Sequence, residues 1–288
     1  IRPQTREHLI ALEAKNVKNV AIIQNKIDLV TKEQAIKNYN EIKEFVKGTI
    51  AENSPIIPVS AQQKVNIEKI YEYLAEVNLP KRDLFSSPIF LIARSFDINR
   101  PGINARNLHG GVLGGSLKRG ILKKGDEIEI KPGICIIERN QKIYESVKTK
   151  ILSIHRGDYE VESASAGGNL AIETELDMSL TKSDNLSGCV AGLVGTLPEI
   201  KNKIRMKAHL FKELMGVERQ VLIEKFKLSE LLMLSINTSI SVGRIVKIDD
   251  DFLEVDLNIP VICFPGDNVG IARNFEGHWR LIGFGELS

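Results

Sequence analysis

The sequence predicts an α/β half-domain followed by two β-barrels, and three observations support this fold class. Helix and strand patterns alternate over residues 1–83, in the order of the C-terminal half of a doubly wound sheet. From residue 84 onward, short apolar runs between glycine turns replace helical periodicity, which is typical of small barrels. A break at Gly195–Pro198 divides this β-rich part in two. We therefore predict three domains, over residues 1–83, 84–197 and 198–288.

Composition limits the class of protein. Of the 288 residues 43% are apolar, which is enough to build buried cores. The formal net charge of +2 does not mark the whole chain as a nucleic-acid binder, so any such contact must come from local basic patches. No stretch is long and apolar enough to cross a membrane, and we expect no membrane partner.

The three cysteines, Cys135, Cys189 and Cys263, are far apart, odd in number and form no C-x-x-C pair. This usage is typical of a reducing compartment and argues against a zinc site, so we expect a cytoplasmic protein with no metal ligands in this span. We interpret all three as buried small apolar residues. The five histidines lack metal-ligand spacing, and no Ser/His/Asp or Cys/His set indicates catalytic residues.

Helical and strand patterns alternate through the first domain. A helix after Thr31 has the capping-box spacing, because Gln34 follows three residues later, and Gly48 is placed to end it. The other elements expected here are a helix over Gln4–Lys15, strands over Val20–Gln24 and Pro55–Val59, and a helix opened by Asn66.

Short apolar runs separated by glycine turns fill the rest of the chain, and nothing from Ser87 onward has the pattern of a long helix. Regular turn signals between short strands predict small barrels. The runs expected as strands include Ile89–Phe96, Glu127–Ile130, Val242–Ile248, Phe252–Leu257 and Val261–Phe264.

A polar motif, Asn25-Lys26-Ile27-Asp28, follows the first buried strand. Guanine presents N1–H and N2–H₂ side by side, and one carboxylate, here Asp28, can accept from both. The Asn25 amide can meet the N7/O6 edge, and the Lys26 stem can lie on the ring face. Adenine lacks the amino group and would leave the carboxylate unpaired, which gives discrimination of roughly 10⁴-fold or more. The alternative interpretation is a polar turn between a strand and a helix.

A second motif, Ser60-Ala61-Gln62, follows the next predicted strand. Such a turn can offer backbone N–H groups to guanine O6. In an open α/β sheet, ligands bind beyond the carboxyl ends of the strands, which is where both motifs fall. We therefore predict a guanine site built from two loops, with Asn25, Lys26 and Asp28 on one and Ser60, Ala61 and Gln62 on the other.

Two basic clusters fall in the β-rich part. One alternates with other residues, so that on a strand its cations share one face: Lys201, Lys203, Arg205 and Lys207. That face could follow RNA phosphates, but we favour a solvated strand face. The other cluster lies beside the glycine-rich turn Gly110–Ser116 and consists of Lys118, Arg119, Lys123 and Lys124.

A guanine-binding α/β domain followed by two barrels resembles the elongation factor Tu class of translational GTPases. Several segments are similar, more narrowly, to the gamma subunit of eukaryotic and archaeal translation initiation factor 2. They are Arg94–Gly102, Gly110–Ser116, Gly120 with Gly125–Ile130, Leu180–Asp184, Gly192–Pro198 and His278–Gly283. The likeness covers nearly the whole chain. It implies that residues 1–83 are the C-terminal part of a P-loop GTPase domain.

The resemblance implies a GTP-dependent carrier, the core of a heterotrimer that delivers methionylated initiator tRNA to the small ribosomal subunit and releases it after GTP hydrolysis. The implied cofactors are GTP or GDP and Mg²⁺. The implied partners also include the alpha and beta subunits and the initiation factors that stimulate hydrolysis and nucleotide exchange.

The resemblance also places the aminoacyl end of the tRNA against the first barrel, where glycines let the backbone approach a nucleotide closely. Val112 and Leu113 are candidates for packing on the terminal adenosine, although barrel core is the interpretation that we favour for them. The residues assigned to tRNA are Gly111, Val112, Leu113, Gly114, Lys118 and Arg119.

The sequence departs from the family in one respect. It contains no G-x-x-x-x-G-K-[ST] loop and no D-x-x-G switch, so the Mg²⁺ ligands and the residue that orients the attacking water are expected upstream. The first residues, Ile1–Gln4, do not include a starting methionine and are typical of the interior of a longer protein. We therefore expect this span alone to be inactive as a GTPase.

Three other interpretations are open. The chain could belong to a selenocysteine-specific elongation factor or to the GTPase subunit of a sulfate-activating enzyme, although Leu180–Asp184 and His278–Gly283 argue against both. The span could also be a non-enzymatic docking platform, which the missing phosphate loop favours.

Overall fold

The computed structural model describes residues 1–14, 17–79, 81–104, 106, 108–139, 141–211, 213–214 and 221–288. The chain divides into two compact units, residues 1–80 with 212–222 and residues 81–211 with 223–288. The first unit contains an α/β segment and the second contains two β-barrels, so the predicted fold class is confirmed.

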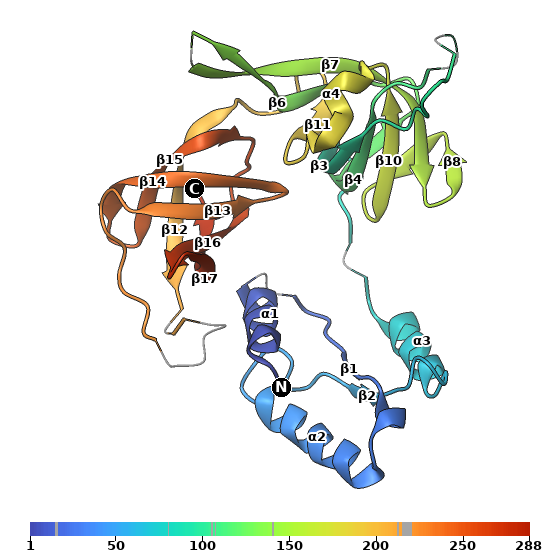
Figure 1. Cartoon of the computed structure of the whole chain (residues 1–288), viewed down its shortest axis with the longest axis vertical. Coiled ribbons are helices and arrows are strands. Elements are labelled where there is room, and N and C mark those ends of the chain that lie inside the picture. Colours follow the sequence, from blue (N-terminus) through green and yellow to red (C-terminus); the bar gives the residue numbers. More distant parts are fainter. Residues whose placement is uncertain are drawn as a thin grey trace. The chain divides into compact units, whose positions relative to one another are not determined.

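The first unit alternates helices and strands in the predicted order (Figure 1). Its two strands pair in parallel, from Ile22 with Ile56 to Gln24 with Pro58. A parallel pair needs a long crossover between its strands, and α2 lies on that connection. The elements are α1 Pro3–Ala14, β1 Ile22–Gln24, the 3₁₀ helix η1 Ile27–Leu29, α2 Lys32–Phe45, β2 Ile56–Pro58 and α3 Ile67–Glu76.

Both strands are shorter than the sequence predicts. The ladder starts where the Ile22 N–H donates to the Pro55 carbonyl. The Val20 carbonyl instead accepts from the Tyr73 hydroxyl at 3.1 Å, so Val20 lies outside the ladder although its side chain is apolar. The small core below the pair consists of Leu9, Val46 and Ala51, with Val20, Ile22 and Phe45 packed against it.

The helix signals are confirmed at α2 and only partly at α3. Thr31 Oγ1 accepts from the Gln34 N–H at 3.3 Å and Gln34 Oε1 accepts from the Thr31 N–H at 3.0 Å, which completes a capping box. Asn66 does precede α3, but its side chain does not cap the helix. Its Nδ2 donates to the Pro58 carbonyl at 2.8 Å, which ties the start of α3 to the end of β2.

The first barrel has six main strands in the order β10-β4-β3-β11-β6-β7, and pairing of β10 with β7 closes it. Only one short helix and one 3₁₀ turn interrupt its described strands. The elements are β3 Ile89–Phe96, β4 Val112–Arg119, β5 Ile121–Lys123, β6 Glu127–Glu138, β7 Gln141–Arg156, β8 Tyr159–Val161, β9 Ser163–Ser165, β10 Asn169–Thr174, α4 Met178–Thr181, η3 Lys182–Asp184 and β11 Val190–Leu193.

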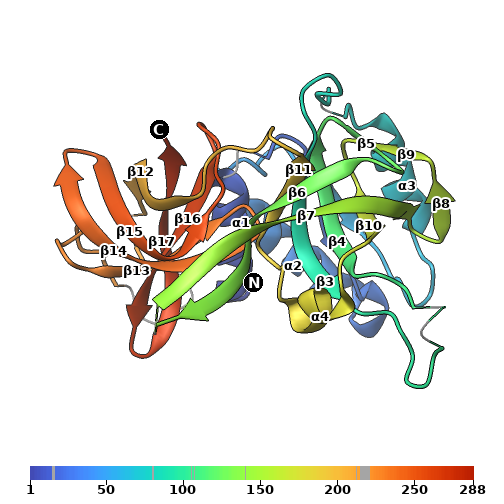
Figure 2. The same ribbon diagram turned by 90° about the horizontal axis from the view of Figure 1, so that it is seen from above.

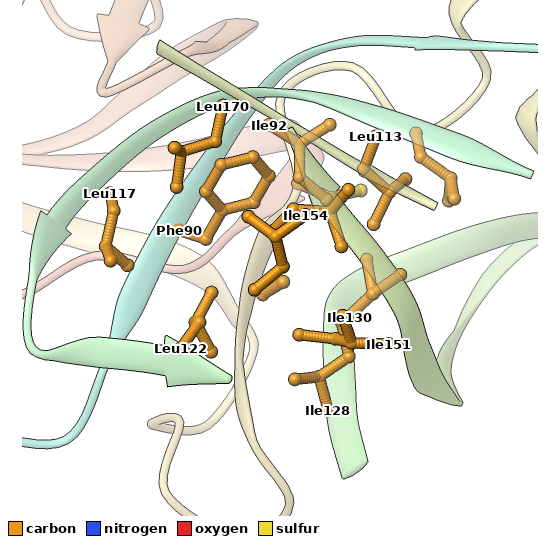
Figure 3. Close-up of a cluster of buried hydrophobic side chains, with 14 of the residues drawn as sticks. Phe90, Ile92, Leu113, Leu117, Leu122, Ile128, Ile130, Ile151, Ile154 and Leu170 are labelled. Carbon is orange, nitrogen blue, oxygen red and sulfur yellow. The ribbon is translucent and has the colours of Figure 1, made fainter. Parts of the chain in front are cut away.

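Alternation along these strands directs one set of side chains inward. Phe90 and Ile92 of β3, Leu113 of β4, and Ile128 and Ile130 of β6 are fully buried in a single cluster (Figure 3). Every other residue of a strand points to the same face, so a closed sheet of such strands fills its own interior.

The second barrel is closed in the order β12-β15-β14-β13-β16-β17 (Figure 2). Its strands are β12 Lys201–Leu210, β13 Leu231–Ile236, β14 Ser239–Asp249, β15 Phe252–Val261, β16 Asn268–Phe275 and β17 His278–Leu287. The strand expected over Val261–Phe264 does not form, because β15 continues to Val261 and the Phe264 N–H donates to Asp267 Oδ2 in a turn.

Within the second unit the two barrels share an apolar contact made by Ile89, Val190, Leu197 and Ile262. The connection between them is held by an ion pair in which Glu129 is buried and Lys131 is half-buried. Lys131 Nζ lies 3.2 Å from Glu129 Oε1 and also donates to the carbonyls of Leu197 and Pro198. The break that the sequence shows at Gly195–Pro198 is therefore a fixed connection.

Candidate functional site

The two predicted guanine loops lie next to each other in the first unit. β1 and β2 are parallel neighbours, so the residues that follow Gln24 and Pro58 emerge at the same edge. The Ile27 N–H donates to the Val59 carbonyl at 3.3 Å, which continues the contact past the strands. The structure therefore brings the predicted residues of both loops together.

Asn25 fastens one loop to the other. Its Oδ1 accepts from the Lys26 N–H at 2.8 Å and from the Ala61 N–H at 3.1 Å. With Oδ1 engaged twice, Nδ2 is the part of the amide that is left to meet a ligand. Because Nδ2 only donates, it suits the N7 and O6 acceptors of guanine, as predicted.

The prediction that the second loop offers backbone N–H groups needs one refinement. The Ala61 N–H is engaged by Asn25. The Gln62 N–H, by contrast, makes no hydrogen bond to any residue in the described part of the chain. In this arrangement Gln62 is the residue of the Ser-Ala-Gln turn whose N–H is open to an acceptor.

Lys26 and Asp28 stand on the turn that η1 forms. Lys26 has a left-handed backbone, with φ of 67°, which is uncommon for a residue with a side chain. The bond from its N–H to Asn25 holds this conformation. Asp28 is exposed, and its carboxylate has no hydrogen-bond or ion-pair partner among the described residues, so it is an open acceptor.

Ser60 and Gln24 are buried residues whose hydrogen bonds hold the backbone next to the two loops. Ser60 is 1% exposed and its Oγ accepts from the Gln63 N–H at 3.1 Å, so it shapes the turn. Gln24, which the sequence analysis did not single out, donates through Nε2 to the Ala35 carbonyl at 2.9 Å and to Asn38 Oδ1 at 3.0 Å. A buried polar residue at a strand end was the available signal for its role.

In the first barrel, some of the residues predicted to bind tRNA are buried in the core and others are not. Val112 and Leu113 are 5% and 0% exposed, and Leu113 belongs to the core cluster, which agrees with the favoured interpretation as core. A side chain added at Gly111 would collide with Thr181, so packing explains that glycine. At Gly114 an added Cβ would be 3.4 Å from the Phe96 ring, an ordinary contact, so packing does not explain that glycine.

Lys118 and Arg119 face the second barrel. Lys118 Nζ lies 2.5 Å from Asp267 Oδ1, and the cations of both residues stand over the Phe264 ring at 5.6 and 5.3 Å. Both side chains therefore have contacts within the protein. Lys124, of the same cluster, pairs with Glu160 at 2.9 Å.

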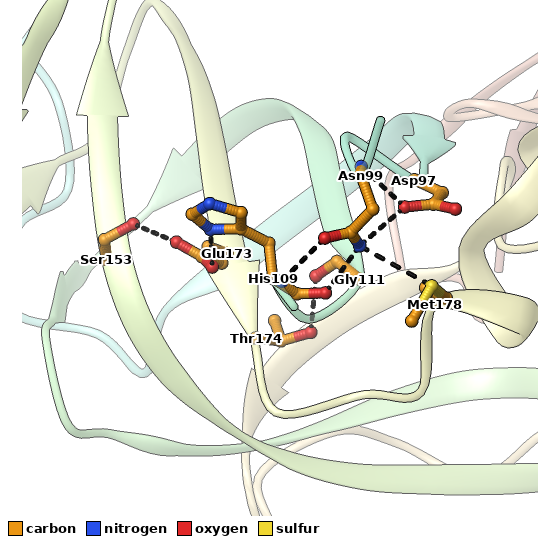
Figure 4. Close-up of polar contacts among 8 residues, drawn as sticks. All are labelled: Asp97, Asn99, His109, Gly111, Ser153, Glu173, Thr174 and Met178. Atoms are coloured by element: carbon orange, nitrogen blue, oxygen red, sulfur yellow. Dashed lines mark hydrogen bonds and ion pairs between the residues drawn. The ribbon is translucent and has the colours of Figure 1, made fainter. Parts of the chain in front are cut away.

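A polar network that the sequence analysis did not predict lies beside Gly111 (Figure 4). Asn99 Oδ1 accepts from the His109 N–H at 2.7 Å and its Nδ2 donates to the His109 carbonyl at 2.8 Å, which closes the loop between them. His109 Nδ1 lies 2.9 Å from Glu173 Oε1, and Ser153 Oγ donates to Glu173 Oε2 at 3.1 Å. Only the fold brings these residues together.

The basic stripe on β12 is matched by acids. Lys203, Arg205 and Lys207 point outward, because the side chains that alternate with them are buried. Their cross-strand neighbours include Asp256, Glu254 and Glu286, respectively. Opposite charges facing each other across strands compensate the local field, so this stripe supports the favoured interpretation of a solvated face.

The interpretation of all three cysteines as buried is wrong for one of them. Cys189 and Cys263 are buried, but Cys135 is exposed. It lies where β6 and β7 continue past the barrel as a two-stranded hairpin, opposite Tyr144.

Among the described residues no three His, Cys, Asp or Glu side chains are grouped to hold a metal ion. In the same part of the chain, every helix is too short or too polar to span a bilayer.

Two family models match separate parts of the chain. The model "Elongation factor Tu GTP binding domain" matches residues 1–80, and the model "Initiation factor eIF2 gamma, C terminal" matches residues 202–287. Among solved structures, selenocysteine-specific elongation factors are similar in fold. A SelB from Methanococcus maripaludis has a TM-score of 0.75 at 20% identity, covering 100% of this chain and 62% of that one.

Curated relatives are more similar in sequence. Translation initiation factor 2 subunit gamma of Methanococcus vannielii is 48% identical over 99% of this chain and 70% of its own length. The proteins of the same name from Methanocaldococcus jannaschii and Pyrococcus horikoshii are 45% and 46% identical, again over 99% of this chain and covering 70% and 69% of their own lengths. The chain therefore belongs to the gamma subunit family of translation initiation factor 2, a family of translational GTPases.

Proposed function

We propose that this chain is the larger part of a GTP-dependent carrier that delivers methionylated initiator tRNA to the small ribosomal subunit. In this proposal it is the core of a cytoplasmic heterotrimer with alpha and beta subunits. Other initiation factors stimulate its GTPase and exchange its nucleotide. The family relationship supports the carrier role, and the two joined loops of the first unit support the choice of nucleotide.

The observation that carries the nucleotide assignment is the pair of hydrogen bonds to Asn25 Oδ1. They leave Nδ2 as the free donor of the amide, which in this proposal meets N7 and O6, while the exposed carboxylate of Asp28 accepts from N1–H and N2–H₂. A base must then present acceptors on one edge and donors on the other, which guanine does and adenine does not. Discrimination of this kind is large because a wrong base leaves polar groups unpaired.

GTP or GDP would bring Mg²⁺, which would supply positive charge next to the phosphates. In this proposal its ligands lie with the phosphate-binding loop, a motif that this sequence does not contain. The residues of this chain hold and select the base, and we expect the 288-residue chain alone to be inactive as a GTPase.

The test is Asp28→Asn in the complete subunit. The amide is a poorer acceptor for N2–H₂ but can donate to the 2-oxo group of xanthine, so we expect weaker GTP binding and a shift of preference toward xanthosine triphosphate. Glu68→Gln is the matched control, because Glu68 is an exposed carboxylate in the first turn of α3. Unchanged GTP affinity in the Asp28 variant would contradict the assignment.

The carrier role needs a separate test, because selenocysteine-specific factors have the same fold. The complete factor should bind methionylated initiator tRNA more tightly than other aminoacylated tRNAs. Equal binding of all of them would contradict the initiation role. The docking-platform alternative predicts that even the complete subunit has no affinity for guanine nucleotides.

A further inference from the structure

Two arginines converge on one turn of the first barrel. Arg82 precedes β3, Arg156 ends β7, and the turn lies between β9 and β10. Arg82 Nη1 donates to the Ala166 carbonyl at 2.8 Å. Arg156 Nη2 donates to the Ser165 carbonyl at 3.0 Å and lies 3.4 Å from the Gly167 carbonyl. The two guanidinium groups are thus gathered around the same short piece of backbone. Strands β7, β8 and β9 meet at this end of the barrel (Figure 2).

Neither arginine is neutralised. Among the described residues, no carboxylate oxygen lies within 4.0 Å of either guanidinium. Two of the carboxylates nearby in sequence are engaged elsewhere, and among the described residues Asp158 makes no ion pair with Arg156. Asp83 Oδ1 accepts from the backbone N–H groups of Phe85 and Ser86, and Glu160 pairs with Lys124. The β12 stripe, by contrast, has an acid opposite each of its last three cations.

The turn holds the arginines in place. Gly167 has a φ of 101°, and a side chain there would collide with the Arg82 guanidinium, so Arg82 lies directly against the backbone. The turn itself is tied to β4 and its following residue by the bonds from Gly167 N–H to the Leu117 carbonyl at 2.8 Å and from Ala166 N–H to the Gly120 carbonyl at 3.0 Å. A guanidinium fixed by backbone carbonyls keeps its remaining donors in a set direction.

Each guanidinium has five N–H donors, and the carbonyls use only one or two of them. Both side chains are exposed, so the remaining donors face solvent. A planar, permanently charged fork with free donors matches the oxygens of a phosphate group, which it can bind through two parallel bonds. Two such forks held around one turn concentrate positive charge, and among the described residues neither is ion-paired with a carboxylate.

We propose that Arg82 and Arg156 form a phosphate-binding site on the first barrel. The ligand is a phosphate group, supplied by an RNA backbone or by free phosphate. The site needs neither the guanine loops nor an aminoacyl group, so it stands apart from the proposed nucleotide binding, and Asp28→Asn should leave it unchanged.

The test uses the 288-residue chain and a fluorescein-labelled single-stranded RNA of about 12 nucleotides, long enough to cover a typical single-strand site. The double variant Arg82→Gln with Arg156→Gln removes both charges but keeps amide donors for the carbonyls, and thermal melting confirms that it is folded. We expect its RNA affinity at low salt to fall by about tenfold or more. The slope of log affinity against log salt should shrink by about 0.7 for each lost contact.

Arg244→Gln is the matched control, because Arg244 is an exposed arginine on β14 of the other barrel. It should leave both the affinity and the slope unchanged. The double variant Arg82→Lys with Arg156→Lys keeps the charge but loses the planar guanidinium group. It should retain the salt slope and show intermediate affinity.

Titration with inorganic phosphate, followed by ³¹P NMR, separates the two sources of the ligand. If the glutamine double variant loses phosphate binding while its RNA binding is unchanged, the site is supported as one that binds free phosphate. If both are lost, the RNA backbone is supported. A folded double variant that matches the original chain in RNA affinity, salt slope and phosphate response would overturn the proposal and leave the arginines as caps of the turn.

Discussion

Lys118 Nζ lies 2.5 Å from Asp267 Oδ1, and this ion pair links the two barrels. The other oxygen of the same carboxylate accepts from Asn237 Nδ2 at 2.9 Å and from the Phe264 N–H at 3.1 Å. Asp267 is only 8% exposed, so one buried carboxylate organises a turn of the second barrel and its contact with the first.

Replacing Asp267 by asparagine should destabilise the chain by about 1–3 kcal/mol. The amide leaves Lys118 without its counter-charge, but Lys118 is 41% exposed and can turn to water, so the loss stays below that of a fully buried pair. Urea unfolding measures the change. Asp250→Asn is the control, an exposed position with a left-handed backbone that asparagine tolerates, and it should change stability by less than about 0.5 kcal/mol. Similar losses in both variants would argue against the junction role.

The two glycines in the middle of β4 should respond differently to alanine. A Cβ at Gly115 would collide with the Leu91 backbone carbonyl, whereas at Gly114 its neighbours would be the Phe96 ring at 3.4 Å and Arg94 at 3.6 Å, which are ordinary contacts. Gly115→Ala should therefore lose about 3 kcal/mol or more, at the upper end of overpacking, and Gly114→Ala should stay within about 1 kcal/mol. Thermal melting of both proteins makes the comparison. A Gly115→Ala variant as stable as the original chain would show that the neighbouring strand can shift to make room for the methyl group.

Acid stability should depend on Arg94 and Asp184. The Arg94 side chain, followed by the Ser95 N–H, lowers the pKa of the Asp184 carboxyl from its usual range. Because the folded pKa is depressed, the stabilisation is present above the unfolded pKa of about 3.9 and is lost as pH falls through the folded pKa. Asp184→Asn should flatten this acid limb, measured as the unfolding midpoint against pH.

Asparagine suits the test because Asp184 has a φ of 60°, a left-handed conformation that asparagine adopts readily. Asp251→Asn, a change at an exposed aspartate of the other barrel, provides the control and should keep the original profile. An unaltered acid limb in the Asp184 variant would assign the pH dependence to other groups.

Thiol chemistry should distinguish the cysteines. Burial raises the pKa of the Cys189 thiol to about 11 and also raises the pKa of Cys263, so neither supplies much thiolate near neutral pH. Cys135 is exposed on the β6–β7 hairpin. A disulfide reagent should modify a single thiol quickly in the folded chain, and Cys135→Ser should remove this fast phase. Persistence of the fast phase in that variant would mean that a buried thiol becomes accessible.

The order of elements was predictable because each depends on local periodicity, as in α2 with its capping box at Thr31 and Gln34. The ends of the strands were less predictable, because backbone hydrogen bonds between strands determine where a strand ends, and the side-chain pattern does not show them. Val20 is apolar but gives its carbonyl to Tyr73. The strand predicted over Glu127–Ile130 continues to Glu138, because its later residues pair with β7 beyond the barrel, and this also exposes Cys135.

The predicted guanine residues were found together, since strand ends in a parallel pair meet at one edge. What joins them could not be read from the sequence. The bond from Ala61 to Asn25 spans 36 residues, and the contact of His109 with Glu173 spans 64. Contacts of this kind depend on which strands become neighbours, a property of the whole fold.

The closure of the loop after β3 has a consequence for how this barrel can diversify. Asn99 uses its side-chain amide as a strand would use its backbone, accepting from and donating to His109. A single side chain therefore closes the loop before the chain enters β4. The pairing of the strands then does not depend on the residues between Asn99 and His109. Doubling the length of such a loop costs only about 0.6 kcal/mol in closure entropy. The barrel thus has a natural insertion point, where new sequence can be accepted while its register is preserved.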